Sequence, residues 1–204
     1  MGKVTIGFSM SLDGFVAGLN DGVDKPLGEG GANLFKWYSL GAPAQKNLEE
    51  GVRLKLSKEE TAKLKDSSRM VGALVYGRRT FDISHAWDGK HPLDVPMVII
   101  THHIPQEWVK PGSPFTFVTD GVENAIRKAK AIAGEKAVAL GSASIVQQGI
   151  QLGLVDEIHI DLVPVLLGGG VRLFEKLGKV PIELEITNME EGLGVTHLDY
   201  RIVK

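Results

Sequence analysis

The sequence predicts an α/β protein with a mixed, mostly parallel sheet that is flanked by helices and ends in an antiparallel hairpin. Short apolar runs alternate with helical patterns from about residue 70 onward, which is typical of parallel strands joined by crossover helices. The stretch from Val180 to Lys204 contains two alternating runs separated by Gly192 and Gly194, which indicates a hairpin. A length of 204 residues fits one domain with an insertion, so we expect residues 1–204 to form a single domain.

The composition is that of a packed globular protein, with 43% hydrophobic and 24% charged residues. A net charge of −2 provides no field that attracts a polyanion, so we expect no nucleic-acid partner. The longest apolar runs fall short of the ~18 residues of a membrane span, so we expect no membrane association. The absence of cysteine excludes disulfides and thiol nucleophiles and, with no signal peptide evident, favours the cytoplasm.

The first strand is expected over residues 3–10, where Val4, Ile6 and Phe8 alternate with smaller or polar residues. The following segment, residues 11–31, is rich in glycine and aspartate. A short apolar stretch at residues 34–40 then precedes a polar, charged segment that runs to residue 66. We interpret residues 19–66 as an inserted loop and helix region that forms a lid or a dimer arm.

Further strands are expected where apolar runs recur, at residues 70–76, 95–101, 115–118, 136–140 and 155–163. Asp120 and Glu123 have the spacing of a capping box and predict a helix that continues to Gly134. Ser142 or Ser144 can cap a second helix, which Gly153 ends.

Two turns between a strand and a helix could bind phosphate groups. At the first, Gly77 is followed by Arg78, Arg79 and Thr80, so that helix N–H groups and two guanidiniums lie together. The alternative is an ordinary turn with two solvated arginines. At the second, residues 141–144 are all small and allow backbone N–H groups to approach a pyrophosphate, although helix capping and close packing of the helix on the sheet would explain this loop better if it stood alone. Two such turns at the carboxyl ends of parallel strands favour a dinucleotide.

Other polar residues and glycines are less specific. Thr101, His102 and His103 end a strand and could hydrogen-bond a phosphate or adenine, whereas adjacent histidines point apart and do not predict a metal site. His159 and Asp161 share a strand face, but a polar outer face explains them and we assign them no role. The glycines at 168–170 could let a substrate or a nicotinamide ring lie against the backbone, or could simply form a turn to a helix over residues 171–177.

Several segments in order resemble the dihydrofolate reductase superfamily, and more closely its branch similar to the C-terminal reductase domain of the bifunctional riboflavin-biosynthesis enzyme. These segments are residues 9–18, 77–81, 141–145, 153–158, 164–174 and 196–201. The resemblance implies a dihydrofolate-reductase-like, mixed eight-stranded sheet, NADPH as the hydride donor and a homodimer.

The resemblance also implies roles for individual residues. Gly77, Arg78 and Thr80 correspond to the turn that holds the cofactor phosphates, with Arg79 at a variable place, and Thr101, His102 and His103 would lie beside the adenosine 2′-phosphate. The small-residue pyrophosphate loop would comprise Gly141, Ser142, Ala143, Ser144 and Ile145, with Ser142 where many members have a second glycine.

On the substrate side, Asp13 is the expected catalytic group because it leaves the first strand where the substrate loop of the family begins. The expected substrate-binding residues are Phe15, Val16, Ala17, Trp37, Leu167, Gly168 and Gly169. The helix that would carry the pterin-binding carboxylate, residues 32–40, contains no acidic residue, which argues against dihydrofolate itself as the substrate. We expect no metal site.

The resulting hypothesis is an NADPH-dependent reductase of a small pyrimidine-, pteridine- or sugar-like carbonyl or imine. The alternative is a nucleotide-binding module that uses the same scaffold without turnover. A scaffold that does not bind NADPH is a third and weaker reading.

Overall fold

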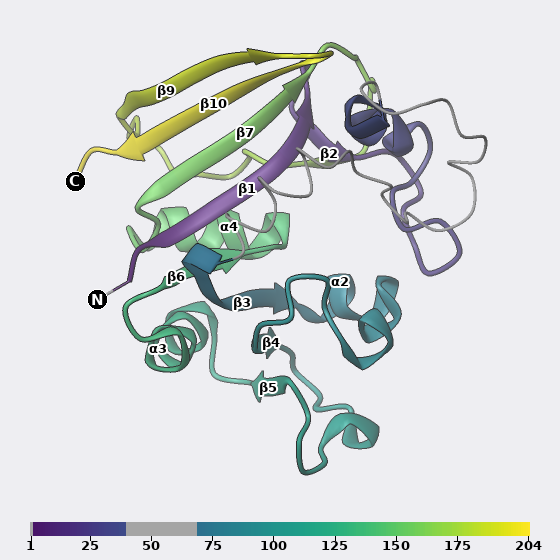
Figure 1. Cartoon of the computed structure of the whole chain (residues 1–204), viewed down its shortest axis with the longest axis vertical. Coiled ribbons are helices and arrows are strands. Elements are labelled where there is room, and N and C mark those ends of the chain that lie inside the picture. Colours follow the sequence, from purple (N-terminus) through teal and green to yellow (C-terminus); the bar gives the residue numbers. More distant parts are fainter. Residues whose placement is uncertain (1, 40–68) are drawn as a thin grey trace.

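The computed structural model describes residues 2–39 and 69–204, and Figure 1 shows its central feature, an eight-stranded sheet in the order β5-β4-β3-β6-β1-β7-β10-β9. The strands of this sheet are β1 (Val4–Ser11), β3 (Val71–Gly77), β4 (Met97–Ile100), β5 (Phe115–Val118), β6 (Ala137–Leu140), β7 (Glu157–Val163), β9 (Leu184–Gly192) and β10 (Val195–Ile202). The helices are η1 (Gly31–Ser39), α2 (Arg78–Ile83), η2 (His85–Gly89), η3 (Gln106–Trp108), α3 (Val122–Ala133) and α4 (Ala143–Gln151).

The sheet is mixed, as predicted. The strands from β5 across to β7 are parallel, whereas β10 is antiparallel to β7 and β9 is antiparallel to β10. The carboxyl ends of all the parallel strands therefore lie at one edge of the sheet, where β2 (Phe15–Ala17) follows β1 and α2 follows β3. Ligands of open α/β sheets bind outside this edge, so the topology already directs attention to the loops there.

Both faces of the sheet carry apolar cores, because successive side chains of a strand point to opposite faces. Val75 belongs to the larger core with residues of α3 and α4, whereas its neighbour Leu74 packs with Phe81 of α2. A third cluster joins Leu34 of η1 to Val163 and Val195. On the α2 side, Phe81 of α2 packs on residues of β3, β4 and β5. The part of that face formed by β1, β7 and β10 carries Ser9, Asp161 and His197, and among the described residues η1 packs there through Leu34 and Trp37.

The predicted strands lie within one or two residues of the observed ones, but the helix starts differ. Helix α3 begins at Val122 with Gly121 at the N-cap position, so the expected capping box from Asp120 is wrong. Ser142 is the N-cap residue of α4, yet its side chain makes no capping hydrogen bond. No helix follows Gly170: residues 171–172 form β8 (Val171–Arg172), which pairs with β2.

The pairing of β2 with β8 depends on glycine at one position. Gly170 has a φ of 132°, and a Cβ there would lie 2.0 Å from the carbonyl oxygen of Ala17. The three glycines at 168–170 thus bring this loop directly against the start of the 19–66 region. Residues 19–39 of that region form the bridges Leu19–Glu29 and Gly22–Lys25 and the helix η1, and the remainder of the expected insertion, 40–66, lies outside the described residues.

Residues 85–88 form a left-handed turn, which has no counterpart in the expected elements. His85, Ala86, Trp87 and Asp88 all have φ between 48° and 51°, a region in which residues with a Cβ are strained and which is seldom occupied by consecutive residues. The turn places Trp87 against Tyr76, with 4.7 Å between the ring centroids.

Candidate functional site

Three loops meet at the carboxyl edge of the sheet, after β3, β4 and β6. The Ser142 hydroxyl after β6 accepts a hydrogen bond from the backbone N–H of Gly77 (2.9 Å) and donates one to Thr80 Oγ1 (2.7 Å). Arg78 Nη1 donates to the carbonyl of His103 after β4 (2.7 Å). Side-chain hydrogen bonds therefore hold the three expected cofactor loops against one another.

Helix α4 begins at this junction without a cap. Because the Ser142 hydroxyl is engaged with Gly77 and Thr80, it does not cap its own helix, and no other side chain of residues 2–39 or 69–204 is recorded as doing so. An uncapped helix start presents backbone N–H groups and the positive end of the helix dipole, both of which favour an anion. The small side chains of Ala143 and Ser144 in the first turn leave those N–H groups accessible to a phosphate.

Gly77 and Gly141, the glycines of these two turns, are glycine for different physical reasons. A Cβ on Gly141 would lie 1.9 Å from the Tyr76 ring, so packing within the chain alone demands glycine there. A Cβ on Gly77 would make only ordinary contacts, the nearest at 3.6 Å from Ile145, and its φ of −81° suits any residue. Nothing in the described chain requires glycine at 77, which fits a position that a ligand approaches closely.

Both arginines of the first turn already have carboxylate partners. Arg78 Nε donates to both oxygens of Asp82 (2.7 and 2.9 Å). Arg79 forms an ion pair with Asp21, and its Nη2 donates to the Asp21 carbonyl (2.7 Å), which ties α2 to the loop before η1. Arg78 thus faces the loop after β4, whereas Arg79 faces away toward residue 21.

The loop after β4 is shaped by Thr101, which is buried. Its hydroxyl donates to the His103 carbonyl (2.8 Å) and accepts from the His103 N–H (3.2 Å). This turn leaves the side chains of His102 and His103 exposed beside Arg78.

Asp13 holds the turn after β1 to the glycine-rich loop. Its carboxylate accepts hydrogen bonds from the Ser11 hydroxyl (2.6 Å) and from the backbone N–H groups of Leu167 (3.1 Å) and Gly168 (2.7 Å). The hydrogen bond from Ser11, with the backbone donors adding to it, lowers the pKa of Asp13 to about 2. Asp13 is therefore ionised at neutral pH and connects two of the expected substrate-binding segments.

The remaining expected substrate residues lie around this connection. Phe15 and Ala17 are buried in β2, with the guanidinium of Arg172 4.5 Å from the Phe15 ring. Trp37 on η1 reaches β1, where its Nε1 lies 3.4 Å from Ser9 Oγ. The structure thus joins Asp13 to Gly168 by a hydrogen bond and places the Trp37 side chain against Ser9 of β1.

Two histidine–aspartate pairs on the polar sheet face were not expected from the sequence. His197 Nδ1 lies 2.7 Å from Asp161 Oδ1, and His159 Nδ1 lies 2.7 Å from Asp199 Oδ1. The alternation of side chains along a strand predicts that His159 and Asp161 share one face, but their partners, Asp199 and His197, lie on β10. Only the register of β10 against β7 reveals the pairs.

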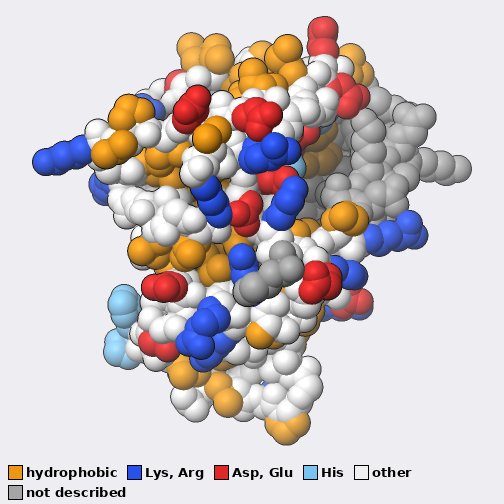
Figure 2. All heavy atoms as spheres, turned by 90° about the vertical axis from the view of Figure 1, so that its left-hand side faces the viewer, with side chains coloured by type: hydrophobic (Ala, Val, Ile, Leu, Met, Phe, Trp, Pro, Cys, Tyr) orange, Lys and Arg blue, Asp and Glu red, His pale blue; other side chains and the backbone are white. Residues whose placement is uncertain are grey.

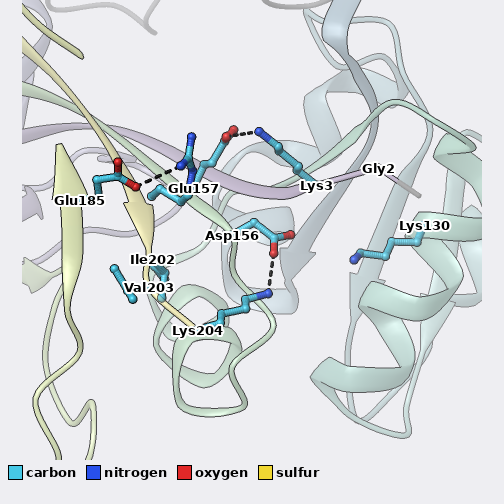
Figure 3. Close-up of a pocket in the computed structure, with 10 residues that line it drawn as sticks. Gly2, Lys3, Lys130, Asp156, Glu157, Glu185, Ile202, Val203 and Lys204 are labelled. Carbon is cyan, nitrogen blue, oxygen red and sulfur yellow. Dashed lines mark hydrogen bonds and ion pairs between the residues drawn. The ribbon is translucent and has the colours of Figure 1, made fainter. Parts of the chain in front are cut away.

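A hollow lies at the opposite edge of the sheet. It has a volume of about 550 Å³ and is lined by both ends of the described chain, at the amino ends of the parallel strands. Figure 2 shows cationic and anionic side chains interspersed on this side of the molecule, and Figure 3 shows three ion pairs in the hollow: Lys3 with Glu157, Lys204 with Asp156, and Arg201 with Glu185. These six charges satisfy one another, whereas Lys130 also lines the hollow and Figure 3 draws no interaction for its ammonium group.

Within residues 2–39 and 69–204, no helix combines the length and the apolarity that crossing a membrane requires. The same residues contain no cluster of three or more acidic or histidine side chains arranged for a metal ion.

Comparison with known proteins gives one family and several structural relatives. The model of the RibD C-terminal domain matches residues 2–197. Protein YyaP of Bacillus subtilis is 27% identical over 144 residues, which is 66% of this chain and 76% of that protein.

Among solved structures, a putative riboflavin biosynthesis protein of Shewanella sp. PV-4 superposes with a TM-score of 0.68 at 23% identity, over 100% of both chains. Dihydrofolate reductase of Enterococcus faecalis, complexed with NADP(H), superposes with a TM-score of 0.55 at 13% identity, over 100% of this chain and 98% of that one. At these identities the two structures establish the fold, an eight-stranded sheet like that of dihydrofolate reductase.

Proposed function

The chain belongs to the RibD C-terminal domain family, and from this premise we propose that it is an NADPH-dependent reductase of a small carbonyl or imine in a pyrimidine-, pteridine- or sugar-like molecule. Reductase activity of the riboflavin-pathway type follows from the family. The use of NADPH and the kind of substrate are the proposal.

The observation that carries the proposal is the uncapped start of α4 at the junction of three loops. The Ser142 hydroxyl is hydrogen-bonded to Gly77 and Thr80 and does not cap α4. The backbone N–H groups of the first turn of α4 are therefore available to a pyrophosphate. Arg78 stands between this junction and the loop after β4, where its guanidinium can meet the 2′-phosphate that distinguishes NADPH from NADH. The match between these groups and a dinucleotide phosphate supports NADPH as the cofactor.

When bound, the cofactor would supply the hydride, and the chain would supply binding and orientation. Residues 77–80 and 141–145 would hold the phosphates, with residues 101–103 beside the adenosine. Asp13 would keep the 167–168 loop against β2, so that the substrate meets a fixed wall.

Two measurements test the proposal. Titration of the purified chain with NADPH and NADH, followed by nucleotide fluorescence or calorimetry, should give tighter binding of NADPH. A screen of NADPH oxidation over aminouracil, pterin and carbonyl compounds should then find turnover. Failure of both cofactors to bind would refute the proposal.

The second candidate is a nucleotide-binding module without turnover. It is favoured by η1, whose residues 31–39 include no aspartate or glutamate that could bind a substrate ring. Tight NADPH binding with no oxidation across the whole panel would support this module over the reductase.

A further inference from the structure

Three polar side chains lie in a row across β1, β7 and β10, on the α2 side of the sheet. Ser9 of β1 is paired with Asp161 of β7, and Asp161 is paired with His197 of β10, so the three side chains project from the same face. The next row consists of Gly7, His159 and Asp199, and the two rows together form the polar half of this sheet face.

This half of the face is open at Gly7 among the described residues. Although β1 is a central strand, Gly7 is exposed, and a Cβ built on it would meet no described atom within 4 Å. Gly7 adjoins the cofactor loops, because β6 ends at Leu140 opposite Ile6, so that Gly141 comes level with Gly7. Without a side chain at residue 7, a flat ring can approach the backbone there.

The two acidic residues of the face differ in one respect. Asp199 uses both carboxylate oxygens, Oδ1 with His159 and Oδ2 with the Asn188 amide (3.0 Å). Asp161 uses only Oδ1, with His197, and its Oδ2 has no hydrogen-bond partner among the described residues. The Asp161 side chain is only 29% exposed. A half-buried carboxylate oxygen without a partner favours a ligand that brings a donor.

The surroundings of the pair fix its orientation. The indole of Trp37 stands edge-on to the His197 ring, with 5.4 Å between centroids, while Trp37 Nε1 reaches Ser9. On the other side, a Cβ on Gly192 would lie 2.8 Å from His197 Nε2, so glycine at 192 gives the imidazole its place. The His197 ring is thereby held with Nδ1 toward Asp161.

We propose that Asp161 is the substrate-binding carboxylate of this site and that His197 is the residue that positions it. The substrate is then a flat nitrogen heterocycle, lying over Gly7, whose ring N–H donates to Asp161 Oδ2. This inference rests on the proposed function only for the identity of the neighbouring ligand, because the pair itself is independent of NADPH.

The test uses 6-aminouracil as the probe and 6-amino-1,3-dimethyluracil, which lacks ring N–H donors, as its matched control. Binding to the full chain is measured by calorimetry or NMR titration, with and without NADPH. We expect 6-aminouracil to bind and the dimethyl compound to bind at least tenfold more weakly. Asp161→Asn should weaken 6-aminouracil binding tenfold or more, whereas Asp199→Asn, the same change in the satisfied pair, should alter it less than twofold.

The positioning role of His197 has its own readout. His197→Ala should weaken the probe about as much as Asp161→Asn, and His197→Asn, whose amide can still donate to Asp161, should restore most of the affinity. Gly192→Ala should also weaken binding by displacing the imidazole. Equal loss in the alanine and asparagine variants at 197 would overturn the positioning role.

The outcomes separate this inference from the proposed function. Lack of 6-aminouracil binding to the wild-type chain, or equal effects of Asp161→Asn and Asp199→Asn, would overturn the inference while NADPH binding stands. Binding of the probe that depends on Asp161 in a chain that does not bind NADPH would uphold the inference and refute the cofactor. Retention of the thermal unfolding midpoint shows that each variant is folded.

Discussion

Several polar side chains of this protein connect one loop to another instead of completing their own element. The Ser142 hydroxyl joins the turn after β3 to the start of α4, and Asp13 joins the turn after β1 to Leu167 and Gly168. Each such hydrogen bond leaves backbone N–H groups elsewhere uncapped or fixes the path of a loop. Substitutions at these positions should therefore change ligand binding more than they change the secondary structure.

At Arg78, substitution should separate the two nicotinamide cofactors. Arg78→Ala should weaken NADPH binding about tenfold or more, because hydrogen bonds to charged groups contribute roughly 1.5–3 kcal/mol, and should leave NADH binding nearly unchanged. Arg79→Ala is the matched control and should have a smaller effect, since the Arg79 guanidinium faces Asp21 and not the loop after β4. Equal affinity of the wild-type chain for NADPH and NADH would contradict the assignment.

At Asp13, the prediction concerns proton transfer. A carboxylate with a pKa of about 2 holds no proton at neutral pH, so Asp13→Asn should change the rate of hydride transfer in single turnovers by less than about tenfold. The side-chain amide of this variant should instead loosen the 167–168 loop and lower the thermal unfolding midpoint. Its NH₂ group would face the backbone N–H of Leu167 or Gly168, and two donors cannot form a hydrogen bond. A 100-fold slower transfer in a variant of unaltered stability would show that Asp13 delivers a proton, directly or through water.

At the scale of residues, a position at the sheet edge was predictable where neighbours along the chain specify it. The small residues at 141–144 follow a strand and precede a helix, so their place at the sheet edge is local information. The pair of Asp161 with His197 spans 36 residues and depends on the register of two antiparallel strands, which no local pattern specifies. The same holds for the bond between Asp13 and Gly168, which are 155 residues apart.

At the scale of elements, the left-handed turn at 85–88 completes an aromatic cluster around the end of β3. Tyr76 packs against Trp87, and its hydroxyl lies 3.1 Å from His91 Nε2. The Leu93 N–H donates to His91 Nδ1, so the imidazole proton is on Nε2 and donates to the Tyr76 hydroxyl. Burial lowers the pKa of His91 to about 4.

This cluster predicts a loss of stability in mild acid. Because the pKa of His91 is about 4 when folded and near 6.5 when unfolded, protonation favours the unfolded state. The contribution is fully present above pH 6.5 and is lost as the pH falls from 6.5 toward 4. Since the ring is partly exposed, we expect about 2 kcal/mol of the free energy of unfolding to be lost over this range.

The measurement is chemical denaturation at several pH values between 4 and 7. His91→Gln, which cannot be protonated, should flatten the profile over that interval. A wild-type profile that is flat between pH 6.5 and 4 would contradict the prediction.

The strands were predictable because buried parallel strands form nearly continuous apolar runs, and β5 agrees at both ends. The left-handed turn was not, since none of its four residues is a glycine and no sequence rule favours that conformation. The start of α3 was also misplaced, because Asp120 with Glu123 imitates a capping box while the chain caps the helix with Gly121.

For the whole molecule, the edge strand β9 predicts an association between two copies. Leu184, Ile186 and Met189 are paired with alternate residues of β10 and therefore share one face, where they are exposed. An apolar edge strand invites a partner, and two-fold dimers are the commonest soluble assembly. We therefore expect a homodimer that buries this stripe, in agreement with the expectation from the family resemblance.

Light scattering at micromolar concentration checks the mass, which should be twice the 22.0 kDa of one chain. Ile186→Lys should give monomers, and Leu166→Lys, at an exposed leucine outside the hairpin, should leave the dimer intact. A wild-type mass near 22 kDa across the accessible range would refute the dimer.

The position of β1 in the sheet has a consequence for synthesis in the cell. Strand β1 leaves the ribosome before β6 and β7, the strands on its two sides, which begin at residues 137 and 157. At about 5–20 residues per second, β1 waits on the order of 6–25 s before β6, the earlier of these neighbours, begins to emerge. During that interval its apolar side chains at 4, 6, 8 and 10 have no sheet to join, so nascent chains of this protein should depend on chaperones that hold such strands until residue 163 has emerged.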